Sequence, residues 1–397
     1  MRVLISGGGI AGPALAYWLG RAGADVTVVE RAPGPRPGGH AVDVRGVARD
    51  VVEAMGLMPA VLAGRVDERG WVMVDSRGRH LASMPATLFG GEGIVAEIEI
   101  SRGDLARILF EATTGAAYRF ADRIVELDQD DSGVSVRFAS GDRGRFDIVV
   151  GADGVRSAVR RLAFGPDASY VRHLGAYTSY FTVPDPGDLD NWFQMYNAPG
   201  GRVAGLRPER GGTAKASLSF RGVLPDDERL DRPAQMRLLA ERLAGAGWKV
   251  PSLLAAMPDA PDFYFDAITA VRVPRWHRGR VVLLGDAGYC GSPLAGMGTS
   301  MSLVGAYVLA GELATGLGPA AAFAEYQTRM AAYVQDGSRL PPGGVAAFAP
   351  KSAFMIKMRA LSMRSMTHRP MKSLLEKQFS KADAITLKPY APTSTHP

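Results

Sequence analysis

Two glycine-rich segments, far apart in the chain, constrain the fold more than any other feature. The first reads Gly-Gly-Gly-Ile-Ala-Gly over residues 7–12, and the second runs over residues 285–298. Each follows an apolar run, residues 3–5 or 281–284, and precedes a helical pattern. A strand, a glycine turn and a helix start point backbone N–H groups and a positive dipole end at an anion or an electron-rich ring. Two such loops flanking a long insert predict one ligand that reaches from a pyrophosphate to a reactive ring, which is the shape of FAD.

The first loop carries a Gly-x-Gly-x-x-Gly fingerprint inside a β-α-β pattern over residues 2–30. Gly7 permits the tight turn, Gly9 lets the backbone approach the pyrophosphate, and Gly12 lets the helix pack on the strand. Glu30 ends the second strand, where a carboxylate accepts hydrogen bonds from ribose hydroxyls. Taken alone, the fingerprint leaves FAD, NAD and a degenerate copy that binds nothing as alternatives.

Composition excludes several classes of protein. The 397 residues carry a net charge of +6, but basic and acidic residues are interleaved, which predicts a solvated surface and no nucleic-acid partner. Cys290 is the one cysteine, which excludes a disulfide framework, and the six histidines lack metal-ligand spacing, so we expect no metal site. The chain has no apolar run of about eighteen residues and no room for a signal peptide before its first strand. We therefore expect a cytoplasmic enzyme, monomeric or homodimeric, without a membrane partner.

The strand and helix patterns predict an α/β protein in three parts. A discontinuous, Rossmann-like FAD-binding domain would comprise residues 1–70, 101–170 and 273–340. An inserted, mostly antiparallel β-sheet domain for the substrate would comprise residues 71–100 and 171–272, because alternating, aromatic-rich strands dominate there. Residues 341–397 would form a C-terminal segment with a methionine-rich helix.

Three motifs follow one another along the chain. After the first loop and Glu30 comes Asp-Gly-x-x-Ser-x-x-Arg over residues 153–160, and then Gly-Asp-Ala over residues 285–287 with Pro293, Gly296 and Gly298. With these motifs in this order, nearly the whole chain resembles the class A flavoprotein aromatic monooxygenases, which share the para-hydroxybenzoate-hydroxylase fold. It is similar above all to the branch that tailors polyketide antibiotics or inactivates tetracyclines. Gly305 is a departure, because the family often has an aspartate at about that position; flavin binding should survive the change.

The resemblance implies roles for the residues beside the flavin. Asp286 would hydrogen-bond the ribityl chain, and the backbone of residues 296–299, at a helix start, would face the pyrimidine edge and stabilise the reduced ring. Pro293 resembles the proline whose carbonyl lies beside the reacting oxygen. With Arg45 and Gly296 it makes up the predicted catalytic set.

Four further polar residues resemble residues of the cofactor site, and three of them have a structural alternative. Arg102 matches the arginine that reaches the flavin from a helix start, and Arg45 lies in the loop that borders the isoalloxazine; for each, the alternative is a surface salt bridge. Asp153 and Arg156 resemble residues that serve FAD and transient NADPH docking, although Asp153 could instead cap a turn. The predicted cofactor-binding residues are Gly7, Gly9, Ile10, Ala11, Gly12, Glu30, Arg31, Arg45, Arg102, Asp153, Arg156, Gly285, Asp286, Pro293, Gly296, Met297, Gly298 and Thr299.

The aromatic-rich sheet over residues 171–272 is expected to cover the flavin. Alternation puts Trp192, Gln194 and Tyr196 on one face of a strand, and Phe193 and Met195 on the other. We favour the Gln194 face for the substrate, because a lone amide among aromatic rings suits a polar group on an aromatic ligand. The predicted substrate residues are Tyr180, Trp192, Gln194, Tyr196, Phe220 and Met297.

The resemblance implies hydroxylation of an aromatic or polycyclic, polyketide-like small molecule through a flavin C4a-hydroperoxide. O2 would be the oxidant, and NADPH, or alternatively NADH, the transient reductant. In such an enzyme the cofactor carries the chemistry, so no acid–base pair is required of the sequence, and none stands out. A Baeyer–Villiger oxygenase, an epoxidase or a reductase on the same FAD fold stays open, as does a non-enzymatic dinucleotide-fold binding protein.

Overall fold

Five parallel strands form the centre of the first domain. The computed structural model describes residues 1–36, 38–88, 98–224, 230–366 and 380–390. The strand order is β18 (Val281–Leu283), β11 (Ile148–Gly151), β1 (Arg2–Ser6), β2 (Asp25–Glu30) and β7 (Ala117–Phe120), with β17 (His277–Arg278) antiparallel at the β18 edge. Val3, Leu4 and Ile5 are all fully buried, because a parallel sheet is covered on both faces.

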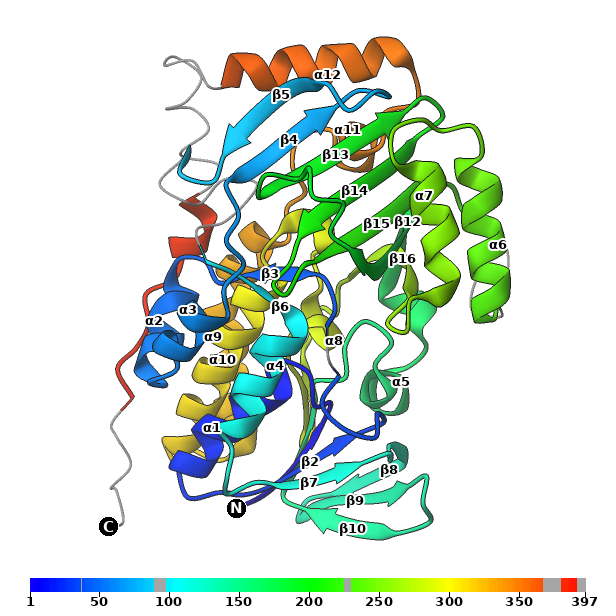
Figure 1. Cartoon of the computed structure of the whole chain (residues 1–397). Coiled ribbons are helices and arrows are strands. Elements are labelled where there is room, and N and C mark those ends of the chain that lie inside the picture. The colour runs from blue at the N-terminus through cyan, green and yellow to red at the C-terminus, as the bar shows by residue number, and fades with distance from the viewer. Residues whose placement is uncertain (37, 89–97, 225–229, 367–379, 391–397) are drawn as a thin grey trace.

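Three helices that pack on one another accompany this sheet (Figure 1). They are α1 (Ala11–Arg21), α9 (Gly298–Ala314) and α10 (Pro319–Gly337). Helix α9 is buried along most of its length between the other two, which explains why its sequence is apolar nearly all round. Smaller helices surround this core: α2 (Val47–Ala54), α3 (Met58–Gly64), α4 (Arg102–Glu111), α5 (Ala158–Phe164) and α8 (Asp286–Tyr289).

A three-stranded antiparallel sheet packs into the same core. Its strands are β8 (Ile124–Asp130), β9 (Gly133–Phe138) and β10 (Arg143–Phe146). Val134, Val136 and Phe138 are buried in one cluster with the residues of β1 and β11. Figure 1 shows this sheet at the end of the molecule farthest from the second domain.

The second domain is a seven-stranded sheet. Its strand order is β16 (Tyr264–Val271), β12 (Val171–Pro184), β15 (Thr213–Arg221), β14 (Arg202–Pro208), β13 (Trp192–Ala198), β4 (Gly70–Val74) and β5 (His80–Pro85). Every neighbouring pair is antiparallel except β13 with β4. The predicted fold class, an α/β FAD-binding domain with an inserted, mostly antiparallel sheet, is confirmed.

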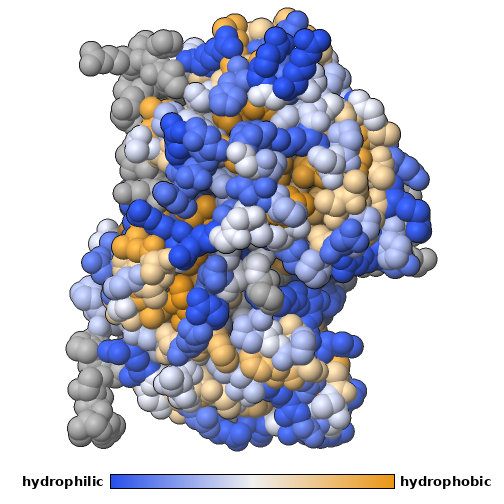
Figure 2. Space-filling view, in the orientation of Figure 1, coloured by the Kyte–Doolittle hydropathy of each residue, from blue (hydrophilic) through white to orange (hydrophobic). Residues whose placement is uncertain are grey.

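Each face of the second sheet has its own helical cover. Helices α6 (Arg232–Leu243) and α7 (Val250–Ala256) share a buried apolar cluster with one face. Helix α12 (Ala353–Met366), with the short α11 (Gly344–Phe348) before it, covers the β5 end of the other face. Phe354 and Leu361 of α12 are exposed, and Figure 2 shows hydrophobic residues at this upper edge. The part of that face that α12 leaves uncovered turns toward the first domain (Figure 1).

A short ribbon lies between the two domains, and the last described segment of the chain packs on the first domain. A short antiparallel ribbon of β3 (Ala41–Asp43) and β6 (Glu99–Ser101) lies between the two large sheets in Figure 1. Residues 380–390 return to the first domain, where the Tyr390 hydroxyl donates to Glu312 Oε1 at 2.7 Å. Among the helices that the structure describes, none is long and apolar enough to cross a bilayer.

Replacement of Gly311 by alanine should destabilise the protein, because the added Cβ would lie 2.3 Å from the Tyr390 ring. We expect a loss of about 1–3 kcal/mol in the free energy of unfolding, the usual cost of overpacking. Gly20→Ala is the matched control, since it also lies within a helix and its Cβ meets nothing within 4 Å. The control should gain up to about 1 kcal/mol from helix propensity. Urea unfolding measures both, and equal effects would contradict the packing argument.

Candidate functional site

The first glycine loop contains two glycines that the fold requires, Gly7 and Gly12, and one, Gly9, where an added Cβ would meet only the end of a side chain. Gly7 has a φ of +114°, and a Cβ there would lie 2.4 Å from the Ala152 carbonyl oxygen. A Cβ on Gly12 would lie 1.9 Å from the Gly7 carbonyl oxygen. A Cβ on Gly9 would meet only the end of a side chain, Arg102 Nη2, at 3.1 Å. The backbone at Gly9 is therefore accessible to a ligand.

The start of α1 offers hydrogen-bond donors beside this loop. Its N-cap residue is Ile10, which has no side chain able to accept from the first N–H groups of the helix. Glu30 holds the loop from the other side: its Oε2 accepts from the Gly8 N–H and its Oε1 from the Ala32 N–H, both at 2.8 Å. Carboxylate oxygens have lone pairs beyond these two bonds, so Glu30 can accept further donors.

The second glycine loop meets the first. A Cβ on Gly285 would lie 3.3 Å from Ala11 Cβ, so the strand end after β18 packs directly on the first turn of α1. Asp286 follows, and burial raises the pKa of its carboxyl while the nearby Arg102 guanidinium lowers it. Arg102 therefore lies near both loops, within contact of Gly9 and within electrostatic reach of Asp286.

The backbone that leads into α9 also has few atoms packed against it. A Cβ on Gly298 would be 3.7 Å from Asp286 Oδ1, and one on Gly296 would be 3.9 Å from Asp43 Oδ2. The N-cap residue of α9, Met297, makes no side-chain cap bond. This seventeen-residue helix therefore directs free N–H groups and its positive dipole end at the space beside the two loops.

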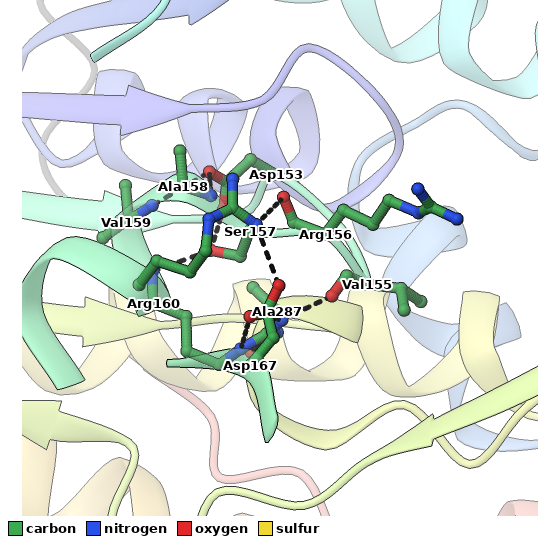
Figure 3. A network of polar contacts seen from close by, with 10 residues as sticks. Asp153, Val155, Arg156, Ser157, Ala158, Val159, Arg160, Asp167 and Ala287 are labelled. Carbon is green, nitrogen blue, oxygen red and sulfur yellow. Dashed lines mark hydrogen bonds and ion pairs between the residues drawn. The ribbon is translucent and has the colours of Figure 1, made fainter. Parts of the chain in front are cut away.

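The Asp-Gly motif is a structural clamp, drawn in Figure 3. Asp153 Oδ2 accepts from the backbone N–H groups of Ala158 at 2.8 Å and Val159 at 3.2 Å, and the Ser157 hydroxyl donates to Oδ1. The carboxylate therefore holds the first turn of α5, whose N-cap residue is Ser157. The Ser6 hydroxyl of β1 donates to the same Oδ2 at 3.3 Å, which fixes α5 to the strand before the first loop.

Arg160, which we did not predict as a site residue, connects this clamp to the second loop. Its side chain is fully buried, and its Nη1 donates to the Ala287 carbonyl oxygen at 2.8 Å while its Nη2 pairs with Asp167 Oδ1 at 2.6 Å (Figure 3). Ala287 directly follows Asp286. The signal was present in the sequence, because Arg160 is the last residue of the second motif. In Figure 3 the Arg156 side chain points away from this network, and it pairs with Asp266 of β16 at 2.8 Å.

A buried carboxyl cluster lies between the second loop and the second sheet; it comprises Asp43, Glu68, Glu99, Arg45 and Arg207. The pairing of β3 with β6 sets Asp43 opposite Glu99. Arg45 Nη2 lies 2.7 Å from Asp43 Oδ2, and Arg207 lies 3.2 Å from Glu68 and 3.1 Å from Glu99. Burial raises the pKa of Asp43 to about 7 and that of Glu99 to about 8, so the cluster holds protons near neutral pH.

His40 and Arg102 connect the first glycine loop to the second sheet. The His40 and Tyr180 rings are stacked with centroids 4.9 Å apart, and the His40 carbonyl oxygen accepts from the Arg102 N–H at 3.1 Å. Burial and the Arg102 charge lower the pKa of His40 to about 4, so its imidazole is neutral at physiological pH. Arg207 lies over the Phe193 ring, 4.4 Å from its centroid. The sheet therefore presents Tyr180, Phe193 and Arg207 to the first domain.

The predicted substrate face is wrong for four of its residues. Tyr196 and Phe220 lie in the core that the sheet shares with α6 and α7, and Trp192 packs against that core. The buried Gln194 amide donates to the Asp188 carbonyl oxygen at 3.0 Å. Alternation sorts the residues correctly into two faces, but nothing within β13 indicates which face the later helices α6 and α7 cover.

The remaining predicted residues are spread along the two loops. Met297 is buried in the core of the first domain beside Gly337, so its side chain is not part of the sheet-facing surface. Pro293 begins a short 3-10 helix (Pro293–Ala295) and is exposed, as is Arg31 at the end of β2. Thr299 lies in the first turn of α9.

Comparisons with known proteins agree with this geometry. The family model described as FAD binding domain matches residues 1–337. An uncharacterized protein of Mycobacterium tuberculosis (strain ATCC 25618 / H37Rv) is 44% identical over 352 residues, covering 88% of this chain and 94% of that protein. A flavin-dependent monooxygenase from an unknown prokaryotic organism is 40% identical over 334 residues, covering 84% of this chain and 86% of its own length. The crystal structure of tetracycline destructase Tet(55) superposes with a TM-score of 0.82 at 35% identity, covering 98% of each chain.

Alanine at Gly12 and at Gly9 should have different consequences. Gly12→Ala should destabilise the fold by about 3 kcal/mol or more, because its Cβ would overlap a backbone oxygen that cannot move aside. Gly9→Ala should keep the stability to within about 1 kcal/mol, since a flexible side chain can yield, but should reduce the FAD content. Thermal unfolding of the apoprotein and flavin absorbance separate the two effects, and equal losses of stability would count against the assignment.

The carboxyl cluster should make stability fall as pH rises. The pKa values of Asp43 and Glu99 are raised from 3.8 and 4.5, so above about pH 4 the folded state binds more protons than the unfolded chain. The free energy of unfolding should decline from there to about pH 8, and Asp43→Asn or Glu99→Gln should flatten that decline. Asp75→Asn is the control, because this carboxyl lies outside the cluster and hydrogen bonds from Arg79 and Arg77 lower its pKa. Denaturant titrations at several pH values test this, and unchanged slopes in both cluster variants would refute it.

Proposed function

Because the chain belongs to the FAD-binding-domain family and is a flavin-dependent monooxygenase, we propose that it hydroxylates a polycyclic, polyketide-like aromatic compound, with NADPH or alternatively NADH as reductant. One observation carries this proposal: the two glycine loops contact each other and leave backbone accessible to a ligand. The sheet face with Tyr180 and Phe193 lies above them. The similarity to a tetracycline destructase supports a multi-ring substrate with phenol and carbonyl groups.

The residues present fit FAD. The open backbone at Gly9 and the uncapped start of α1 suit the pyrophosphate, and Glu30 retains capacity to accept ribose hydroxyls. Asp286 lies between the loops, where it can accept from a ribityl hydroxyl. Bound FAD would supply the electrons that activate O2 and deliver one oxygen atom to the substrate.

The chain itself contributes position and electrostatics. The N–H groups over residues 296–299 and the dipole of α9 would stabilise negative charge on the pyrimidine edge of the flavin. In the proposal, Arg102 at the start of α4 and Arg45 in the loop after β3 would help to hold the flavin, and the Pro293 carbonyl would face the reacting atoms. Arg156, partly exposed where β16 meets the first domain, suits transient docking of the NADPH phosphates.

We propose that the enzyme works in the cytoplasm. The single cysteine, Cys290, is free and buried, which supports a reducing, cytoplasmic environment. We propose a monomer or homodimer that needs no partner beyond its small-molecule substrate, the reductant and O2. Size-exclusion chromatography with light scattering measures the oligomeric state directly.

The proposal predicts a yellow protein whose NADPH oxidation rises with one polycyclic phenol and yields a product one oxygen atom heavier. Arg102→Ala should lower the affinity for FAD about tenfold or more, the usual cost of losing a charge-assisted contact. Arg107→Ala is the matched control, because that exposed arginine on the same helix pairs only with its helix neighbours in the ion pairs observed, Asp104 and Glu111. Mass spectrometry and flavin titration measure these outcomes.

Contrary results would point to specific alternatives. A ring-expanded or epoxidised product, or a reduced one, would replace hydroxylation by another reaction on the same fold. A colourless protein that does not take up added FAD would overturn the proposed function.

A further inference from the structure

The carboxyl cluster lies where a substrate over the second loop would meet the protein. Asp43 Oδ2 is 3.9 Å from the Cβ position of Gly296, and the Arg45 N–H donates to the Ser300 hydroxyl of α9 at 3.1 Å. On the other side Arg207 contacts the Phe193 ring of the sheet. The cluster therefore connects the flavin loop with the substrate sheet and borders the space between them.

Both arginines of the cluster are already neutralised. Arg45 is paired with Asp43, and Arg207 is held between Glu68 and Glu99, whose side chains are each 2% exposed. Three carboxyls face two guanidinium groups, so without a bound proton the cluster would carry one uncompensated negative charge in a buried site. Such a charge is costly, and the cluster resolves it by keeping a carboxyl protonated.

Three other described cations near this space have an acidic partner or neighbour, and Arg359 of α12, on the same sheet face, donates to Asn197 Oδ1 and to the Phe348 carbonyl oxygen, both at 2.9 Å. Lys215 lies 2.8 Å from Asp262 and 3.5 Å from Glu209. Arg156 is paired with Asp266, and Arg102 lies in the field of Asp286 at the flavin loops. The neutral His40 ring, stacked on Tyr180, adds no positive charge. A carboxylate on the substrate would therefore lose its hydration without gaining a cation in return.

We propose that Glu68 and Glu99 determine substrate specificity by occupying Arg207, so that the site accepts uncharged phenol- and carbonyl-bearing ring systems and rejects aromatic carboxylates. This inference rests on the proposed function, because it takes the space between the second loop and the sheet as the substrate site. The neutral carboxyl of the cluster donates a hydrogen bond to a carbonyl or phenol oxygen. The same cluster, balanced in charge, offers a carboxylate no free counter-charge, so it favours the uncharged class over the charged one.

The test compares two dihydroxyanthraquinones that differ in one group: aloe-emodin carries a hydroxymethyl and rhein a carboxylate. Isothermal titration calorimetry on the FAD-loaded protein gives the affinity for each. We expect wild type to favour aloe-emodin, and the variant Glu68→Gln/Glu99→Gln to raise the rhein-to-aloe-emodin affinity ratio about tenfold or more, since a released guanidinium gains a charge-assisted hydrogen bond.

A triple variant identifies the cause. Adding Arg207→Met to the two glutamine substitutions should return the ratio to near the wild-type value, because the gain depends on the freed guanidinium. If the double variant does not fold, as judged by thermal unfolding, Glu68→Leu/Glu99→Leu takes its place, because it also removes both carboxylates from Arg207, and the ratio should still rise.

The inference is overturned by an unchanged ratio in a folded variant, by wild type binding rhein as tightly as aloe-emodin, or by wild type binding neither. Failure of the proposed function is distinguishable, because it appears as absent flavin absorbance or absent NADPH oxidation, whereas the affinity ratio comes from heat of binding.

Discussion

The close approach of the two glycine loops is the constraint on which the rest of the structure depends. Backbone oxygens 1.9 Å and 2.4 Å away leave no room for a Cβ at Gly12 and Gly7, and a Cβ on Gly285 would lie only 3.3 Å from Ala11 Cβ. This contact brings the starts of α1 and α9 to one place, although almost three hundred residues separate them. Two helix N-termini then direct donors into one site, which a single strand–turn–helix unit cannot provide.

The loops would not hold this arrangement by backbone contacts alone. Buried Arg160 joins the Asp-Gly motif to Ala287, so the cap of α5 and the position of Asp286 form one unit. Arg102 performs a comparable task at the surface of the site, since it lies between Gly9 and Asp286 while its backbone bonds to His40. The planar guanidinium of Arg160 donates to three acceptors at once, the Ala287 and Val155 carbonyl oxygens and Asp167 Oδ1, which a lysine could not reproduce.

Much of the fold could be predicted because its signals are local. The fingerprint over residues 7–12, the aromatic alternation of the inserted strands and the order of three motifs each depend on neighbours in the chain, and they indicated the FAD-binding fold and its insert. The carboxyl cluster carries no such signal. Asp43, Glu68, Glu99 and Arg207 come from four separated segments, and their shared environment arises only when β3 pairs with β6 beneath β14.

The sequence by itself determined the cofactor loops, because tight turns and helix starts require particular residues at fixed spacing. It also determined that each strand of the insert has two unlike faces. Only the tertiary structure decided which face is free: α6 and α7 bury Tyr196 and Phe220, and so leave Tyr180 and Phe193 toward the flavin loops. The physical reason is that a side chain's neighbours across a sheet, and the burial that raises the pKa of Asp43, depend on segments far away in the chain.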